Sequence, residues 1–327
     1  MLKERIERQQ KSIQHAKTIN MKLMMNNRTL GYRSRELARR KMSPYFSPRT
    51  VNIVDSAIYS DFFGYLDGII LDIPITVVHL ANVIPDRSNL VMTGNFRQIH
   101  KGYLKNGEAI VLKRVRPSFS FSDEKCLAVL SVELRIAKLV GNHPNIADNL
   151  GLFLSGATSY IVQMYESPLN LRQYLSAKRV LKKGFVSWFV KGFSDGILHI
   201  YSKGVLNNNL TPKNIILKLS CQYYTPIITS FSLACREESA KPLTILQQET
   251  HKESYHLPQC VRNGSKPPSL SSDLYSFGHI IGSLSKTMET EIDFHIRCLS
   301  GECIGMNVKT ATAFEILVEQ LCTLIDE

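Results

Sequence analysis

The residues best placed for chemistry lie in a short polar loop between two apolar runs. The run before the loop, residues 185–201, has helical periodicity, and residues 215–217 after it have the composition of a short strand. A polar loop fixed by a helix and a strand is a common place for catalytic and binding side chains. An amide cannot act as a general base at neutral pH. The polar side chains of this loop include four amides and a hydroxyl, which are Asn207, Asn208, Asn209, Asn214 and Thr211.

The loop resembles the catalytic loop of protein kinases, H-R-D-L-K-x-x-N. In that alignment Asn209 stands at the catalytic Asp and Thr211 at the Lys, whereas Asn214 matches the metal-binding Asn. Residues 230–232, Ser-Phe-Ser, lie where kinases carry Asp-Phe-Gly, so Ser230 stands at the Asp that holds magnesium. The resemblance therefore implies degenerate catalytic positions at Asn209, Thr211 and Ser230, and leaves Asn214 as a weak candidate metal ligand.

The resemblance extends from residue 90 almost to the C-terminus. Lys113 lies in a segment like the V-A-I-K strand and stands at the lysine that contacts the α- and β-phosphates of ATP. Glu133 stands at the helix glutamate that pairs with this lysine. Residues 272–278, Ser-Asp-Leu-Tyr-Ser-Phe-Gly, resemble the start of the central helix of the large lobe, where Asp273 has the structural role of holding the loop backbone.

The segment that matches the glycine-rich loop retains a single glycine, Gly94, because Met92 and Arg97 occupy the other two glycine positions. These larger side chains hinder the approach of the backbone to phosphates, although Arg97 could itself contact a phosphate. Gln163 falls at the gatekeeper position, and Met164 begins the hinge. The nucleotide-binding residues that the resemblance implies are Gly94, Lys113, Glu133 and Met164.

The retained residues serve positioning, and the lost residues serve chemistry. We therefore expect a catalytically inactive pseudokinase that acts as a signalling scaffold or allosteric binding module, with at most weak ATP binding and little or no magnesium binding. One alternative is a divergent active ATP-dependent kinase that uses another acid, such as Glu237 or Glu238. A second alternative is an adaptor that binds no nucleotide.

The expected fold class is α+β, with the two-lobed fold of protein kinases. A small lobe, residues 89–163, would hold an antiparallel sheet and one helix, and a mostly helical large lobe would span residues 167–327. Residues 1–50 form a basic, partly helical leader, and residues 51–88 are a connecting segment that we expect to pack as an accessory layer on the small lobe.

Charge is concentrated in the leader. Residues 1–50 contain 5 Lys and 8 Arg against 3 Glu, a net charge of +10, out of +12 for the chain of 327 residues. An acidic partner surface is one expected contact of this segment. The leader is expected to be a solvated helix; the alternatives are a coiled coil, a basic amphipathic helix on an acidic partner or membrane surface, and a mitochondrial targeting peptide.

The composition argues against several other classes of protein. The 7 cysteines are scattered without a C-x-x-C pair, which indicates neither a zinc site nor a disulfide framework. We expect no secretory signal, because charges begin at Lys3, and no membrane span, because no apolar run reaches about 20 residues. No specific nucleic-acid motif is present. We expect an intracellular protein, most simply cytoplasmic, whose partners are other proteins.

Overall fold

The structure is a computed structural model. It describes residues 46–47, 70, 72–78, 82–94, 96–117, 121–177, 181, 183–220, 223–250, 257–285 and 290–326. The chain divides into two compact units, Met1–Tyr45 and Phe46–Glu327, and every described residue belongs to the second unit. The helix expected in the leader lies outside the described residues.

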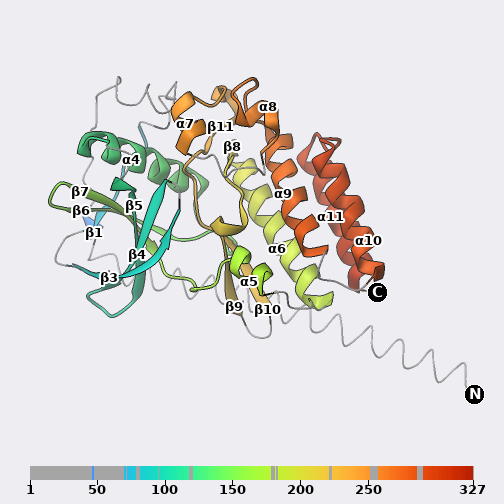
Figure 1. The fold of residues 1–327 in the computed structure, drawn as a ribbon, viewed down its shortest axis with the longest axis horizontal. Helices are drawn as coiled ribbons and strands as arrows, with labels where there is room; N and C mark the ends of the chain where they lie inside the picture. Colours follow the sequence, from blue (N-terminus) through green and yellow to red (C-terminus); the bar gives the residue numbers. More distant parts are fainter. Residues whose placement is uncertain are drawn as a thin grey trace, which may run out of the picture. The chain divides into compact units, whose positions relative to one another are not determined.

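Five antiparallel strands form the main part of the small lobe (Figure 1). They are β3 (Val83–Thr93), β4 (Arg97–Leu104), β5 (Ala109–Val115), β6 (Asn149–Ser155) and β7 (Thr158–Met164), in the order β6-β7-β5-β4-β3. Gly107 has a φ of +87° in the turn between β4 and β5, which explains the Asn-Gly pair in the sequence. The prediction of an antiparallel sheet in this region is confirmed.

Part of the segment before the small lobe joins this sheet at its edge. Strand β2 (Val77–Val78) pairs in parallel with β6, and β1 (Phe46–Ser47) pairs with β2. The N–H of Leu152 donates to the carbonyl of Thr76 at 2.8 Å, and Ile75 is buried in the small-lobe core. Residues 75–78 therefore extend the sheet, where we expected an accessory layer, and β1 lies within the segment that we expected to be the leader.

Helix α4 (Asp123–Val140) packs across β5, β6 and β7. It begins after Ser122, whose side chain accepts a hydrogen bond from the N–H of Lys125, and it ends at Gly141, which has a φ of 74°. Most of its residues from Ala128 to Val140 are buried. The helix carries Glu133 to the inner side of the small lobe.

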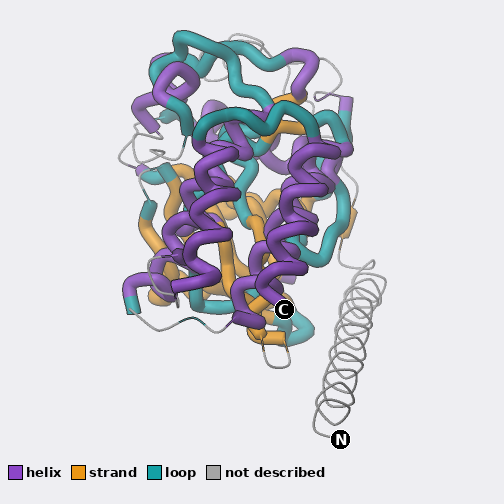
Figure 2. The backbone as a smooth tube through the Cα atoms, turned by 90° about the vertical axis from the view of Figure 1, so that its right-hand side faces the viewer, coloured by secondary structure: helices purple, strands orange, loops and turns teal. Residues whose placement is uncertain are grey.

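The large lobe is mostly helical and is built on four long helices that lie side by side (Figures 1 and 2). They are α6 (Lys183–Ser202), α9 (Leu270–Ser285), α10 (Thr290–Ile304) and α11 (Ala311–Asp326). Buried rings join three of them: Phe193 of α6 stacks on Phe277 of α9, and Phe314 of α11 meets Phe277 edge-on. The helix predicted over residues 185–201 is confirmed as α6.

Shorter elements carry the polar loop and the segment after it. The short helices are α5 (Leu171–Ser176), α7 (Ile245–Thr250) and α8 (Gln259–Arg262), with 3₁₀ turns η4 (Pro212–Asn214) and η5 (Glu237–Ser239). The strand pairs are β8 (Val205–Leu206) with β11 (Cys235–Arg236), and β9 (Ile215–Ser220) with β10 (Tyr223–Ile228). None of the helices in the described ranges combines the length and apolarity that a membrane span needs.

Candidate functional site

The loop between β8 and β9 is held by a carboxylate from the first turn of α9. Asp273 is buried and accepts hydrogen bonds from the backbone N–H of Asn207 at 2.7 Å and of Asn208 at 2.8 Å. Burial raises the pKa of Asp273 to about 6, although the two hydrogen bonds act in the opposite direction. These are the contacts expected of a residue that fixes the backbone of the loop.

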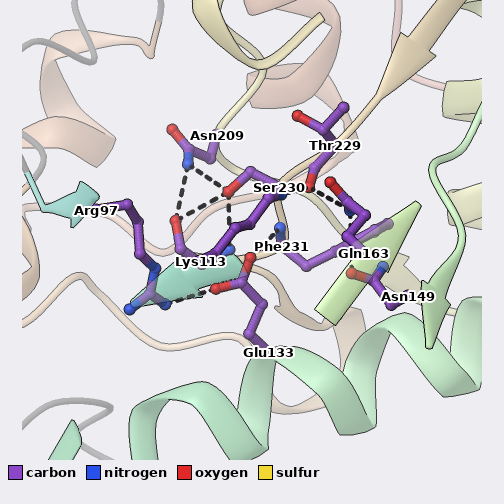
Figure 3. Close-up of polar contacts among 10 residues, drawn as sticks. Arg97, Lys113, Glu133, Asn149, Gln163, Asn209, Thr229, Ser230 and Phe231 are labelled. Atoms are coloured by element: carbon purple, nitrogen blue, oxygen red, sulfur yellow. Dashed lines mark hydrogen bonds and ion pairs between the residues drawn. The ribbon is translucent and has the colours of Figure 1, made fainter. Parts of the chain in front are cut away.

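The amide of Asn209 is directed at two serine hydroxyls from the segment after β10 (Figure 3). Its Nδ2 donates to Oγ of Ser232 at 2.8 Å and to Oγ of Ser230 at 3.3 Å. Ser230 Oγ also donates to Ser232 Oγ at 3.3 Å. The groups at the positions of the catalytic Asp and the metal-binding Asp therefore hydrogen-bond to each other.

These side chains do not fit the magnesium ion that the kinase resemblance implies. Magnesium is held by carboxylate and phosphate oxygens, whereas Ser230 and Asn209 supply a hydroxyl and an amide. Asn214 directs its Nδ2, a hydrogen-bond donor, to the carbonyl of Asn209 at 2.9 Å. In the part of the chain that the structure describes, no group of three or more His, Cys, Asp or Glu side chains could hold a metal ion. Thr211 is half-buried at the start of η4 and has no carboxylate partner among the hydrogen bonds of the described residues.

Lys113 lies on β5 and is 5% exposed. Its ammonium group donates to the backbone carbonyl of Thr229, at 2.6 Å, just before Ser230. Burial lowers the pKa of Lys113 to about 8; the carboxylate of Glu133 opposes this shift, and the positive charge of Arg97 adds to it. Lys113 therefore faces the cleft between the lobes, as predicted, but binds a neutral carbonyl.

Lys113 and Glu133 both reach the cleft and are close enough for their charges to interact, but the carboxylate of Glu133 forms its ion pair with Arg97 (Figure 3). The Nη2 atom of Arg97 lies 2.5 Å from Oε2 of Glu133, and the two side chains are 11% and 6% exposed. In the register of the sheet Lys113 lies opposite Ile99, so Arg97 is diagonal to Lys113 on the same face. Two cationic side chains therefore compete for one carboxylate, and the planar guanidinium is better suited to it.

Glu133 also contacts the segment that begins at Ser230. Its Oε1 accepts a hydrogen bond from the N–H of Phe231 at 3.2 Å. Burial by itself raises the pKa of Glu133, but the charges of Arg97 and Lys113 and the bond from Phe231 outweigh burial and lower this pKa. Glu133 is therefore ionised, and it connects α4 to Arg97 in the small lobe and to Phe231 in the large lobe.

The backbone conformation at position 94 does not require a glycine. Its φ lies outside the left-handed region, and a Cβ built on it would meet only the carbonyl of Arg97, at 3.7 Å. The N–H of Gly94 donates to that same carbonyl at 2.9 Å. The backbone N–H is thus used within the turn, although a glycine-rich loop uses such groups to bind phosphates.

The sequence did not predict that the backbone carbonyl of Thr229 is a shared hydrogen-bond acceptor in the cleft. This carbonyl accepts from Lys113 and also from Nε2 of Gln163 at 3.1 Å, and Gln163 donates in addition to Oδ1 of Asn149 at 3.0 Å. A carbonyl acceptor has no signature in the sequence, but the amide at the gatekeeper position is a signal that could have been followed. Met164 ends β7, where its N–H is already bonded to the carbonyl of Asp148 at 2.9 Å.

A separate cavity of about 50 Å³ lies between α4 and the segment after β10. Val132 and Ile136 of α4 line it, together with Asn208 and Leu233. Among the described residues, Oδ1 of Asn208 is buried without a hydrogen-bond partner. The volume suits one or two water molecules and not a nucleotide, so this cavity is not the ligand site that kinases have.

Comparison with known proteins agrees with the fold. Residues 87–292 match the family model described as protein kinase domain. Similar proteins include a probable serine/threonine-protein kinase of Arabidopsis thaliana, PBL28, which is 24% identical over 204 residues, 59% of this chain and 52% of the relative. Cysteine-rich receptor-like protein kinase 10 of Arabidopsis thaliana is 25% identical over 257 residues, 75% of this chain and 35% of the relative.

A mammalian protein is similar to the same degree. Dual specificity testis-specific protein kinase 1 of Mus musculus is 23% identical over 253 residues, which make up 73% of this chain and 36% of the relative. The chain thus spans about a third to a half of the length of these relatives. Since the family model covers more than half of the chain and the described residues form its two lobes, the chain belongs to the protein kinase domain family.

Proposed function

We propose that this chain is a pseudokinase, a kinase fold that serves as a signalling scaffold or allosteric binding module and does not transfer phosphate. The observation that carries the proposal is the hydrogen bonding of Asn209 with Ser230 and Ser232. In a kinase the first two positions hold the base and the principal metal ligand. Here neutral groups fill both positions and satisfy each other.

The chemistry that these substitutions remove is large. Loss of a general base lowers the rate by about 10²–10⁴. Loss of the metal carboxylate removes a further several kcal/mol of charge stabilisation, as an order-of-magnitude figure. Lys113 still offers a positive charge, so we propose that ATP binds weakly and with little dependence on magnesium.

The alternative of a divergent active kinase needs an acid near Ser230, and the two candidates that the sequence suggested are occupied elsewhere. Glu237 accepts a hydrogen bond from the hydroxyl of Tyr201 at the end of α6. The carboxylate of Glu238 is paired with Arg236 at 2.6 Å, and its side chain is 78% exposed. Both contacts disfavour a catalytic role for these glutamates.

A phosphotransfer assay with purified chain, magnesium and labelled ATP tests the proposal. We expect incorporation no higher than that of Lys113→Met, and no change in Asn209→Ala, because an amide is no base. Robust magnesium-dependent autophosphorylation that Asn209→Ala abolishes would overturn the proposal in favour of an active kinase.

A thermal-shift titration with ATP, with and without magnesium, separates the scaffold from an adaptor that binds no nucleotide. We expect a small shift that is similar with and without magnesium and is lost in Lys113→Ala. No shift in either condition would favour the adaptor. The carboxylate in Ser230→Asp should make the shift depend on magnesium, because it adds the charged ligand that Asn214 lacks.

The partners that we propose are proteins inside the cell, and the cytoplasm is the simplest location. Residues 1–50, with their net charge of +10, would contact an acidic surface. The full chain should be retained on an acidic resin, and the chain that lacks residues 1–50 should not be retained. This pair of results would support the contact.

A further inference from the structure

Arg97 makes contacts in the small lobe that connect strand β4 with helix α4. Arg97 is the first residue of β4 and follows the turn that contains Gly94. Its guanidinium lies 4.4 Å from the ring centroid of Phe96, which is buried, and its Nη2 binds Glu133 in the middle of α4. A stacked guanidinium paired with a carboxylate is held in one orientation by both contacts.

Glu133 transmits this contact to the other lobe. One carboxylate oxygen accepts from Arg97, and the other accepts from the N–H of Phe231. The side chain of Phe231 is 2% exposed and belongs to the hydrophobic core that the large lobe shares with α4. The chain of contacts from β4 through α4 to residue 231 is therefore continuous.

Lys113 takes no direct part in this chain of contacts. Its ammonium binds the carbonyl of Thr229, and the same carbonyl retains a second donor, Gln163, if Lys113 is removed. The charge of Lys113 acts on both members of the pair, so a neutral residue at position 113 would remove an attraction to Glu133 and a smaller repulsion of Arg97, while the direct contact between Arg97 and Glu133 would remain.

We propose that Arg97, and not Lys113, is the positioning residue that holds helix α4 against the cleft. Arg97 joins the strand after the degraded glycine loop to Glu133, and Glu133 joins α4 to Phe231. This arrangement needs neither nucleotide nor magnesium, and it is independent of whether the protein transfers phosphate.

Two matched variants test the proposal, Arg97→Met and Lys113→Met. Each replaces a buried cationic side chain by an apolar chain of similar length. Hydrogen exchange of peptides that cover α4 and residues 229–233 is measured by mass spectrometry on the full chain, together with the melting temperature. We expect Arg97→Met to speed exchange in both peptides at least about tenfold and to lower the melting temperature by roughly 6 °C or more, because it leaves a buried carboxylate unpaired.

Lys113→Met should change exchange in α4 by less than about threefold and the melting temperature by at most about 3 °C. Arg97→Lys keeps the charge, and it should restore most of the protection of α4. Glu133→Gln keeps the acceptor for Phe231 but removes the charge. If Arg97 and Glu133 act as a unit, the effect of Glu133→Gln should be nearly absent in the Arg97→Met background and undiminished in the Lys113→Met background.

If exchange in α4 rises as much in Lys113→Met as in Arg97→Met, the proposal is overturned, because Lys113 would then position the helix as much as Arg97 does. Unchanged exchange in Arg97→Met would overturn it too, because Lys113 would have moved to replace Arg97. The Lys113→Met measurement alone keeps the proposal falsifiable if Arg97→Met does not fold. Neither result bears on phosphotransfer, so failure here is distinct from failure of the proposed function.

Discussion

The carboxylate of Asp273 should make the stability of this protein depend on pH in a direction that can be calculated. Asp273 is 3% exposed, and burial raises its pKa from 3.8 to about 6. The folded state therefore binds the proton more tightly than the unfolded state does. In this case Asp273 contributes stability at low pH, and the contribution falls as the pH rises through 6. Between pH 5 and pH 7 the linkage relation gives a loss of about 1.3 kcal/mol.

Asp273→Asn isolates this contribution, because asparagine does not titrate. The variant should be less stable than the wild-type chain, by about 1–3 kcal/mol, since its NH₂ group faces one of the loop N–H groups that the carboxylate accepts. The free energy of unfolding is measured by urea denaturation of both proteins at pH 5, 6 and 7. The stability advantage of the wild-type chain should shrink by about 1.3 kcal/mol across this range.

Taking the difference between the two proteins removes the titration of every other group. An advantage of the wild-type chain that grows with pH would refute the reasoning. It would mean that the bonds from Asn207 and Asn208 outweigh burial and that the pKa of Asp273 is depressed.

Two further predictions concern packing. Phe277→Ala should lower the free energy of unfolding by about 3–5 kcal/mol in urea denaturation, because the ring is fully buried between two others; Phe294→Ala, 62% exposed, should stay within about 0.5 kcal/mol. Gly151→Ala should lower the melting temperature by several degrees and loosen β2, because its φ is +151° and the new Cβ would lie 2.4 Å from a backbone carbonyl of residue 76. Gly301→Ala, whose Cβ meets nothing within 4 Å, is the matched control, and an equal loss there would contradict the argument.

Much of the fold could be predicted because local sequence signals agreed with the tertiary structure. The helix predicted over residues 185–201 and the strand that carries Lys113 each formed where they were expected. Strand β10 ends at Ile228, because the next residue, Thr229, bonds to Asn214 and Lys113 and leaves the ladder. Strand β2 could not be predicted, since two valines paired in parallel with a distant strand leave no periodic pattern.

The electrostatics of the cleft were harder to predict than its outline. The resemblance to kinases placed Lys113 and Glu133 at the cleft, and both side chains are buried in the structure. Their partners depend on which cation reaches the carboxylate, and that is decided by the register of β4 against β5 and by the stacking of Arg97 on Phe96. The replacement of a glycine by Arg97 predicted only a hindered approach to phosphate, because sequence position does not reveal where a long side chain turns.

The substitutions in the cleft form a consistent set. A buried carboxylate without a cation is costly, and so is a buried ammonium without an anion. If Asn209 and Ser230 were carboxylates, the cleft would need magnesium to neutralise them. With neutral side chains at both positions, one carboxylate, Glu133, is balanced by Arg97, while the ammonium of Lys113 donates to the carbonyl of Thr229 and burial lowers its pKa to about 8. The carboxylate of Glu133 is therefore balanced without a ligand, although Nε and Nη1 of Arg97 are buried without a hydrogen-bond partner among the described residues, so this part of the cleft does not need ATP or magnesium to offset its negative charge.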